Sequence, residues 1–306
     1  MKTTRRGFMK AAAFGAGAAA LAPLTAHASD DTASFGPNEV GMLYDSTLCV
    51  GCKACVYACR KANFDLDDSS YLSKKDAADT RWQDVYELDY RTRNIIKMYT
   101  NPDDPKDYAF IKRACNHCNH AGCVSACPVK AMTKNPETGV VEYDKSRCVG
   151  CRYCQLACPF NVPAFEWHQA IPKIVKCEMC RDTNLKTKGI TACAEVCPAK
   201  AIVYGKRADL LEEAKNRLAA NPDRYINKIY GEKDYGGTNI LYLSRVDFEK
   251  LGLPNVPEHS YARTSENIQH TLYKNMIAPA VLYTVLAVAA FRNIKKNHSD
   301  DDKGGH

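Results

Sequence analysis

The chain has 306 residues, including 16 cysteines, with a hydrophobic content of 45% and a formal net charge of +7. This hydrophobic content is enough for a packed core and excludes global disorder. Basic residues are scattered among acidic ones, whereas nucleic-acid-binding proteins gather them on one face, so no nucleic-acid partner is expected.

The N-terminus has the pattern of a twin-arginine export signal. Arg5 and Arg6 precede an Ala/Gly-rich stretch, which ends in the small-x-small cleavage site Ala26-His27-Ala28. We expect a Tat signal peptide over residues 1–28, with the Tat machinery as a partner. Tat exports proteins that have already folded, which suits a protein that receives a metal cofactor in the cytoplasm. The alternative is a basic tail on an Ala-rich helix.

The cysteines form four groups of four between residues 49 and 197. The groups are Cys49, Cys52, Cys55 and Cys59; Cys115, Cys118, Cys123 and Cys127; Cys148, Cys151, Cys154 and Cys158; and Cys177, Cys180, Cys193 and Cys197. Motifs one and three have the spacing C-x2-C-x2-C-x3-C, which is typical of [4Fe–4S] proteins, and motifs two and four are variants of it. In this pattern the fourth cysteine ligates a different cluster from the first three. We therefore predict four [4Fe–4S] clusters, with all sixteen cysteines binding iron.

Zinc and disulfides are the alternatives for these cysteines. A zinc ribbon pairs two C-x2-C knuckles, and closely spaced triplets are poor disulfide staples, so both fit less well. Gly51 and Gly150 should let the backbone approach a cluster. His117 and His120 are expected to be polar loop residues. No nucleophile–base pair and no nucleotide fingerprint is recognisable, so no residue is predicted to perform bond chemistry on a substrate.

Several elements can be predicted around the motifs. Each motif should combine a short strand, a cysteine loop and a short helix after the last cysteine. Residues 60–107 read as an insertion with a strand near Asn94–Tyr99. Asp209–Ala220 has the apolar spacing of an amphipathic helix, and Ile240–Leu243 reads as a strand. No site chemistry is recognisable in residues 222–265.

The C-terminal region predicts a membrane anchor. Met276–Phe291 is uncharged and mostly apolar, and with its flanks approaches the roughly 20 residues that cross a bilayer. Arg292 and two lysines follow, which places that end in the cytoplasm by the positive-inside rule. A buried core helix is the alternative.

The sequence resembles the four-cluster ferredoxin-type electron-transfer subunits of membrane respiratory oxidoreductases, such as formate dehydrogenase and dimethyl sulfoxide reductase. Within this family it is similar to the iron–sulfur subunits encoded with nickel–iron hydrogenase-2. The residues that carry the likeness are Leu43–Cys52, Cys158–Pro163 and Ser265–Lys274, together with the two end signals. The expected domains are 1–28 (signal), 29–205 (four-cluster region), 206–265 (C-terminal extension) and 266–306 (anchor and cytoplasmic tail).

The resemblance implies an α+β fold of two interleaved bacterial-ferredoxin-like domains with insertions, plus a C-terminal transmembrane helix. It also implies crossed ligation: Cys49, Cys52, Cys55 with Cys197 (cluster 1); Cys177, Cys180, Cys193 with Cys59 (cluster 2); Cys115, Cys118, Cys123 with Cys158 (cluster 3); Cys148, Cys151, Cys154 with Cys127 (cluster 4). The implied partners are the small and large subunits of a nickel–iron hydrogenase and a quinone-reactive integral membrane subunit. The protein would lie on the periplasmic side of the inner membrane. The alternative is the equivalent subunit of a formate dehydrogenase or molybdenum reductase.

Overall fold

The computed structural model describes residues 35–64, 87–104, 106–167, 169–263, 266 and 282–293. The predicted signal peptide and much of the predicted anchor lie outside these ranges. Within them, no helix is long and apolar enough to span a bilayer. Residues 282–293 are helical.

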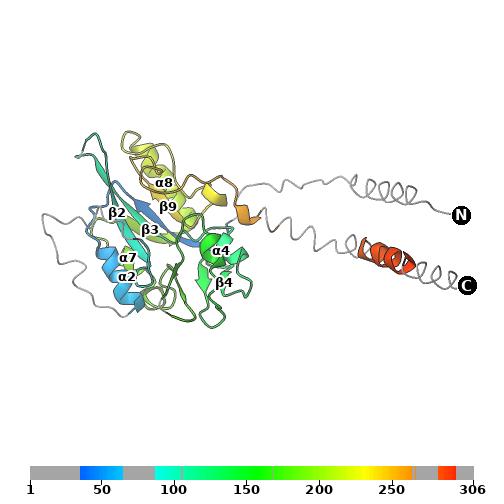
Figure 1. Ribbon diagram of the computed structural model, residues 1–306. Helices are drawn as coiled ribbons and strands as arrows, with labels where there is room; N and C mark the ends of the chain where they lie inside the picture. Colours follow the sequence, from blue (N-terminus) through cyan, green and yellow to red (C-terminus); the bar gives the residue numbers. More distant parts are fainter. Residues whose placement is uncertain are drawn as a thin grey trace, which may run out of the picture. The chain divides into compact units, whose positions relative to one another are not determined.

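Strand β1 (Val40–Asp45) is the centre of a three-stranded sheet that joins distant parts of the chain. It pairs antiparallel with β8 (Ile202–Lys206) and parallel with β9 (Ile240–Leu243). Helix α8 (Arg207–Ala220) packs on one face of this sheet, where Leu43 faces its buried Leu210. On the other face the short helix α7 (Ala192–Glu195) packs against α2 (Ala54–Phe64), as Figure 1 shows. We call this the outer half, because it combines the first and fourth motifs.

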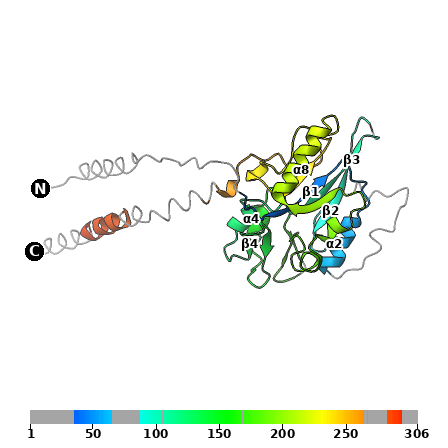
Figure 2. The same cartoon turned by 180° about the vertical axis from the view of Figure 1, so that it is seen from behind.

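The second and third motifs form an inner half of the same kind. Hairpin β4 (Met132–Lys134) and β5 (Val141–Tyr143) accompanies the two short helices α4 (Gly122–Ser125) and α5 (Tyr153–Leu156), which pack together. Figures 1 and 2 both show α2 and the α4–β4 region at opposite ends of the body. The mixed helix and strand content agrees with the predicted α+β class.

The remaining elements are smaller. They are the hairpin β2 (Asn94–Thr100) and β3 (Tyr108–Ala114), the two-residue strands β6 (Ala164–Phe165) and β7 (Ile174–Val175), helix α6 (Asn184–Lys188), and the 3-10 turn η2 (Asp234–Gly236). The predicted strand near Asn94–Tyr99, helix over Asp209–Ala220 and strand over Ile240–Leu243 are thereby confirmed.

The position of the short helices differs from the prediction. In motifs two, three and four the helix carries the third cysteine and ends before the fourth, instead of following it. The fourth cysteine precedes Pro128, Pro159 or Pro198, and a residue before proline is disfavoured in helical conformation. Motif one has Arg60 in place of this proline, so α2 continues through Cys59 to Phe64. The Arg60 guanidinium donates a hydrogen bond to the Thr92 hydroxyl at 3.2 Å and ties the longer helix to the segment before β2.

Candidate iron–sulfur sites

The predicted ligand groups can be followed as four thiol sets. Set 1 is Cys49, Cys52, Cys55 and Cys197; set 2 is Cys59, Cys177, Cys180 and Cys193; set 3 is Cys115, Cys118, Cys123 and Cys158; set 4 is Cys127, Cys148, Cys151 and Cys154. All sixteen are free cysteines in the structure.

Set 1 gathers around one apolar cavity. Cys49, Cys52, Cys55 and Cys197 all line it, between the loop before α2 and the loop after α7. Burial raises the pKa of Cys49, and the charge of Cys197 adds to this rise. Tyr44 lines the same cavity; its hydroxyl donates to the Phe110 carbonyl oxygen at 2.9 Å and lies within hydrogen-bonding reach of the Cys49 thiol. The structure thus brings the last cysteine of the chain to the first three.

Set 2 lies between the C-terminal half of α2 and the fourth motif. Burial raises the pKa of Cys59 to about 12, and the charges of Cys180 and Cys193 raise it further. The Asn63 Nδ2 donates to the Cys59 carbonyl oxygen at 2.9 Å and lies 3.6 Å from both the Cys59 and the Cys180 sulfur, which its second hydrogen faces. Because Asn63 is one helical turn after Cys59, the extension of α2 past Arg60 is what delivers this donor.

Set 3 is buried in the inner half. Burial raises the pKa of Cys118 well above its ordinary value, and the neighbouring thiols that raise it further are Cys158, Cys115 and Cys123. Such charge effects weaken with distance, so these four thiols are close neighbours. Three of them are buried and Cys158 is partly exposed.

Set 4 combines the third motif with the last cysteine of the second. Burial raises the pKa of Cys154 to about 12, and the thiols that raise it further are Cys148, Cys151 and Cys127. The Tyr143 hydroxyl hydrogen-bonds Cys148, five residues after it, just as Tyr44 does with the first cysteine of motif one. The two stretches form an internal sequence repeat, in which Tyr-Asp is followed, after three intervening residues, by Cys-Val-Gly-Cys, and both copies make this contact.

The four sets follow one another in a fixed order. The charge of Cys193 in set 2 raises the pKa of Cys55 in set 1, and the charge of Cys154 in set 4 raises the pKa of Cys123 in set 3. Buried Tyr242 lies near both set 2 and set 3: after burial, the charges of Cys115 in set 3 and Cys177 in set 2 raise its pKa. The order is therefore 1–2–3–4. Exposed cysteines occur only in the two end sets: Cys52 in set 1 and Cys151 in set 4.

The loops of all four motifs share one backbone feature. The residue two positions after the first cysteine has a positive φ in each: Gly51 (69°), His117 (48°), Gly150 (73°) and Met179 (52°). The residue three positions after the fourth cysteine does so in motifs two, three and four: Lys130, Asn161 and Lys200. Such reversals turn successive N–H groups toward a concave side that suits anions. The glycines were predicted from the sequence, whereas His117 and Met179 were not.

Backbone and side-chain donors approach the sulfurs, which is what an anionic cluster requires. The Ala131 N–H lies 3.2 Å from the Cys127 sulfur, and the Met179 N–H lies 3.4 Å from the Cys177 sulfur. His117 is fully buried; its Nδ1 accepts from the Val141 N–H at 2.9 Å, and its Nε2 has no partner in the described part of the chain. Buried thiols with raised pKa values keep their protons at neutral pH unless metal cations displace them. The donor set therefore fits iron–sulfur clusters.

A single metal ion makes a different geometric demand. In the described ranges, no three His, Cys, Asp or Glu side chains converge closely enough to hold one ion. In a cubane cluster each thiolate binds a different iron atom, so its four ligands stand farther apart than those of one ion.

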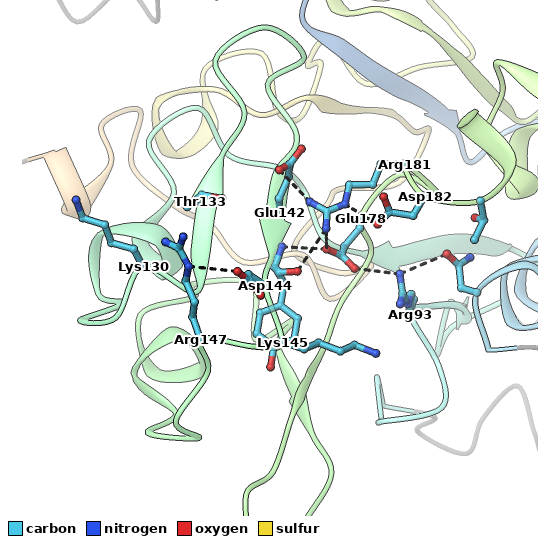
Figure 3. Close-up of a pocket in the computed structure, with 13 residues that line it drawn as sticks. Arg93, Lys130, Thr133, Glu142, Asp144, Lys145, Arg147, Glu178, Arg181 and Asp182 are labelled. Atoms are coloured by element: carbon cyan, nitrogen blue, oxygen red, sulfur yellow. Dashed lines mark hydrogen bonds and ion pairs between the residues drawn. The ribbon is translucent and has the colours of Figure 1, made fainter. Parts of the chain in front are cut away.

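A charged pocket of about 670 Å³ has Asn63 and Tyr143 in its lining and therefore lies beside sets 2 and 4 (Figure 3). Ion pairs and hydrogen bonds among its lining residues fix the orientation of the Asn63 side chain. The Glu178 carboxylate pairs with Arg93 at 3.3 Å and Arg181 at 3.6 Å and accepts the Tyr143 N–H. Arg93 also donates to the Asn63 carbonyl oxygen at 3.3 Å. This bond holds the Asn63 side-chain oxygen, so that the NH2 group is turned toward the Cys59 carbonyl oxygen and the two sulfurs.

The structure also brings residues to the sites that sequence reasoning missed. Tyr235 and Tyr242 come from residues 222–265, where no site chemistry was recognised. After burial, the charges of Cys118, Cys158 and Cys123 raise the pKa of Tyr235, so this phenol lies against set 3. Neither tyrosine has a local sequence signal, whereas Asn63 could have been found from its helical spacing to Cys59.

Comparison with known proteins agrees with these sites. Residues 106–207, which contain motifs two to four, match the family model of the 4Fe-4S dicluster domain. The Hydrogenase-2 operon protein HybA of Escherichia coli O157:H7 is 40% identical over 326 aligned positions, which cover 97% of each chain. This chain belongs to the HybA family. The Shigella flexneri HybA matches equally well.

The chain also has more distant relatives. The iron–sulfur subunit of the nitrate-inducible formate dehydrogenase of Escherichia coli K12 is 29% identical over 72% of this chain and 74% of its own length. Protein NrfC of the same organism is 34% identical over 60% of this chain and 72% of its own length. The predicted family is confirmed, and with it the prediction of an electron-transfer subunit that performs no catalysis itself.

Proposed function

We propose that this chain relays electrons between a periplasmic nickel–iron hydrogenase and a quinone-reactive integral membrane subunit, through four [4Fe–4S] clusters held by the four thiol sets. The observation that carries the proposal is the order of the sets, 1–2–3–4, with Cys52 and Cys151 exposed at the two ends. Such an order suits electron transfer in which the electron enters at one end set, passes through the two inner sets and leaves from the other end set. HybA is named after the hydrogenase-2 operon, which supports a hydrogenase as the partner.

When bound, [4Fe–4S] clusters supply one-electron chemistry. The protein's part is to hold the sets in fixed order and to keep water from the inner ones. Its N–H and O–H donors stabilise negative charge on sulfur, and more strongly when the charge increases, so they favour the reduced state. Asn63 at set 2 and Tyr143 at set 4 would act in this way, whereas the Tyr44 hydroxyl at set 1 donates to the Phe110 carbonyl oxygen.

Export and anchoring form the second part of the proposal. The Tat-type pattern in residues 1–28 would carry the folded protein to the periplasm. Residues 272–306 would then hold it on the inner membrane. In support, the helix over residues 282–293 carries exposed apolar side chains, among them Leu282, Tyr283 and Phe291. The basic residues from Arg292 onward would remain on the cytoplasmic side.

The test begins with the full chain, purified anaerobically from a host that assembles iron–sulfur clusters. Four [4Fe–4S] clusters require about sixteen irons and sixteen sulfides per chain, with cluster signals in EPR after reduction. Zinc without iron would refute the proposal. Purification of the membrane complex then identifies the partner: nickel in the complex supports a hydrogenase, whereas molybdenum would replace it with a molybdenum enzyme.

Crossed ligation is tested with one pair of variants. Cys197→Ser should disturb the cluster that also uses Cys49, whereas Cys193→Ser should disturb the one that also uses Cys59. EPR of the two variants should therefore lose different signals. The same signal lost in both would contradict the crossed arrangement.

A further inference from the structure

Strand β3 carries a buried cation into the space between sets 1 and 2. Alternate residues of a strand point to the same side, so Phe110 and Lys112 share a face. The Phe110 ring lies against Gly51 in the first motif, which shows that this face is turned toward the cysteine loops. Lys112 is only 2% exposed. Ile96, its partner on β2, is buried as well.

The charged groups that surround the Lys112 ammonium are thiols. The thiols that act on it are Cys193, Cys177 and Cys59 of set 2 and Cys55 of set 1. In the described ranges no carboxylate pairs with Lys112. Burial of an ammonium without a counter-ion is strongly unfavourable, so this position makes sense only if negative charge resides on those sulfurs.

A second buried lysine shows the contrast. Lys176 is 3% exposed, but its Nζ donates to the carbonyl oxygens of Val141 and Cys177. The backbone therefore solvates Lys176, although its charge also acts on Cys123, whereas the charges that act on Lys112 within the described ranges are those of cysteines.

We propose that Lys112 is a fixed internal cation that raises the reduction potential of the set 2 cluster above that of the same site without the charge. The proposal rests on the relay proposed above. Each electron that enters a cluster makes it more negative, and a nearby positive charge in a poorly screened interior stabilises that state. Three of the four thiols around Lys112 belong to set 2 and one to set 1. The effect should therefore be largest on set 2, smaller on set 1, and absent from sets 3 and 4.

A higher reduction potential at set 2 would favour the presence of the electron on that cluster. The electron that reduces the set 2 cluster is the one released by a neighbouring cluster, so no other reactant is involved. An electron that enters at either end would therefore spend more time at buried set 2, away from the exposed cysteines, than it would without Lys112.

The experiment compares three variants of the full chain. Lys112→Met removes the charge at similar size, and Lys112→Arg keeps it. Lys97→Met is the matched control, since Lys97 is on the paired strand β2, one residue from Ile96 and therefore on the opposite face, and pairs with Glu87 at 2.8 Å. Each variant is purified anaerobically, analysed for iron and sulfide, and titrated with redox mediators under EPR. Cys193→Ser and Cys55→Ser assign the steps of sets 2 and 1.

In Lys112→Met the reduction step of the set 2 cluster should move to lower potential. The reduction equilibrium constant should fall at least tenfold, which corresponds to 59 mV for one electron. Lys112→Arg and Lys97→Met should stay near the unmodified protein. Unchanged potentials in Lys112→Met, or an equal shift in all four steps, would overturn the proposal. Lys112→Met could lose the set 2 cluster altogether. If Lys112→Arg then retains that cluster, the role of charge is supported. If both variants lose the cluster, the proposal is overturned. A parent chain without iron refutes the relay itself, whereas four clusters with unshifted potentials refute only the role of Lys112.

Discussion

Gly51 offers a direct test of how closely the first cysteine loop is fitted to the strand behind it. Its φ is +69°, which costs an L-residue about 1–2 kcal/mol. A Cβ at this position would also lie 2.4 Å from Cζ of Phe110. Relief of such a contact in a packed region costs about 1–3 kcal/mol. Gly51→Ala should therefore destabilise the protein by about 2–5 kcal/mol.

The chain contains a control for the backbone part of this cost. Gly189 has nearly the same φ, +70°, but a Cβ there would meet no atom within 4 Å. Gly189→Ala should lose only about 1–2 kcal/mol. Thermal unfolding of the loaded full chain, followed by far-UV circular dichroism and by cluster absorbance, should show a clearly lower midpoint for Gly51→Ala, at about 2–4 °C per kcal/mol.

A double-mutant cycle isolates the contact between the loop and the ring. Phe110→Ala should cost less in the Gly51→Ala background than alone, because the clash disappears with the ring. Equal losses for the two glycine variants, or an additive cycle, would refute the reasoning.

Two further predictions concern Asn63 and His117. Asn63→Leu removes the amide that faces the Cys59 and Cys180 sulfurs and should lower the potential of the set 2 cluster; an unchanged EPR-monitored titration would show that these contacts do not tune it. Burial, together with Lys176 and Lys134, holds the pKa of His117 well below its ordinary value of about 6.5. Below about pH 6.5 the His117 side chain binds a proton in the unfolded chain but not in the folded protein. The free energy of unfolding should therefore fall as pH falls, by up to about 1.4 kcal/mol per pH unit, until the pKa of His117 in the folded protein is reached. His117→Asn keeps an acceptor for the Val141 N–H and tolerates positive φ, so denaturation midpoints between pH 7 and 5 should depend less on pH in this variant than in the parent; equal slopes would contradict the assignment.

Much of the site could be predicted because its signals are local. The cysteine spacings, the repeat that includes Tyr44 and Tyr143, and the apolar spacing of α8 lie within short windows of sequence. The longer α2 was not predicted: Arg60 stands where the other three motifs have proline, and the continued helix delivers Asn63. Lys112 and Tyr242 could not be found in this way. Their positions depend on the pairing of β2 with β3 and of β1 with β9, which no local pattern specifies.

The pairing of β1 has a consequence for the order in which the protein is made. Its partners β8 and β9 are synthesised only when the ribosome has reached residues 206 and 243. Sets 3 and 4 need no cysteine beyond Cys158, so the inner half can close while the outer half still lacks Cys193 and Cys197. Contacts between near residues form faster than distant ones, and N-terminal regions generally fold first during synthesis. In this chain the first motif is made first and completed last, so it must remain unpaired until most of the protein has been synthesised.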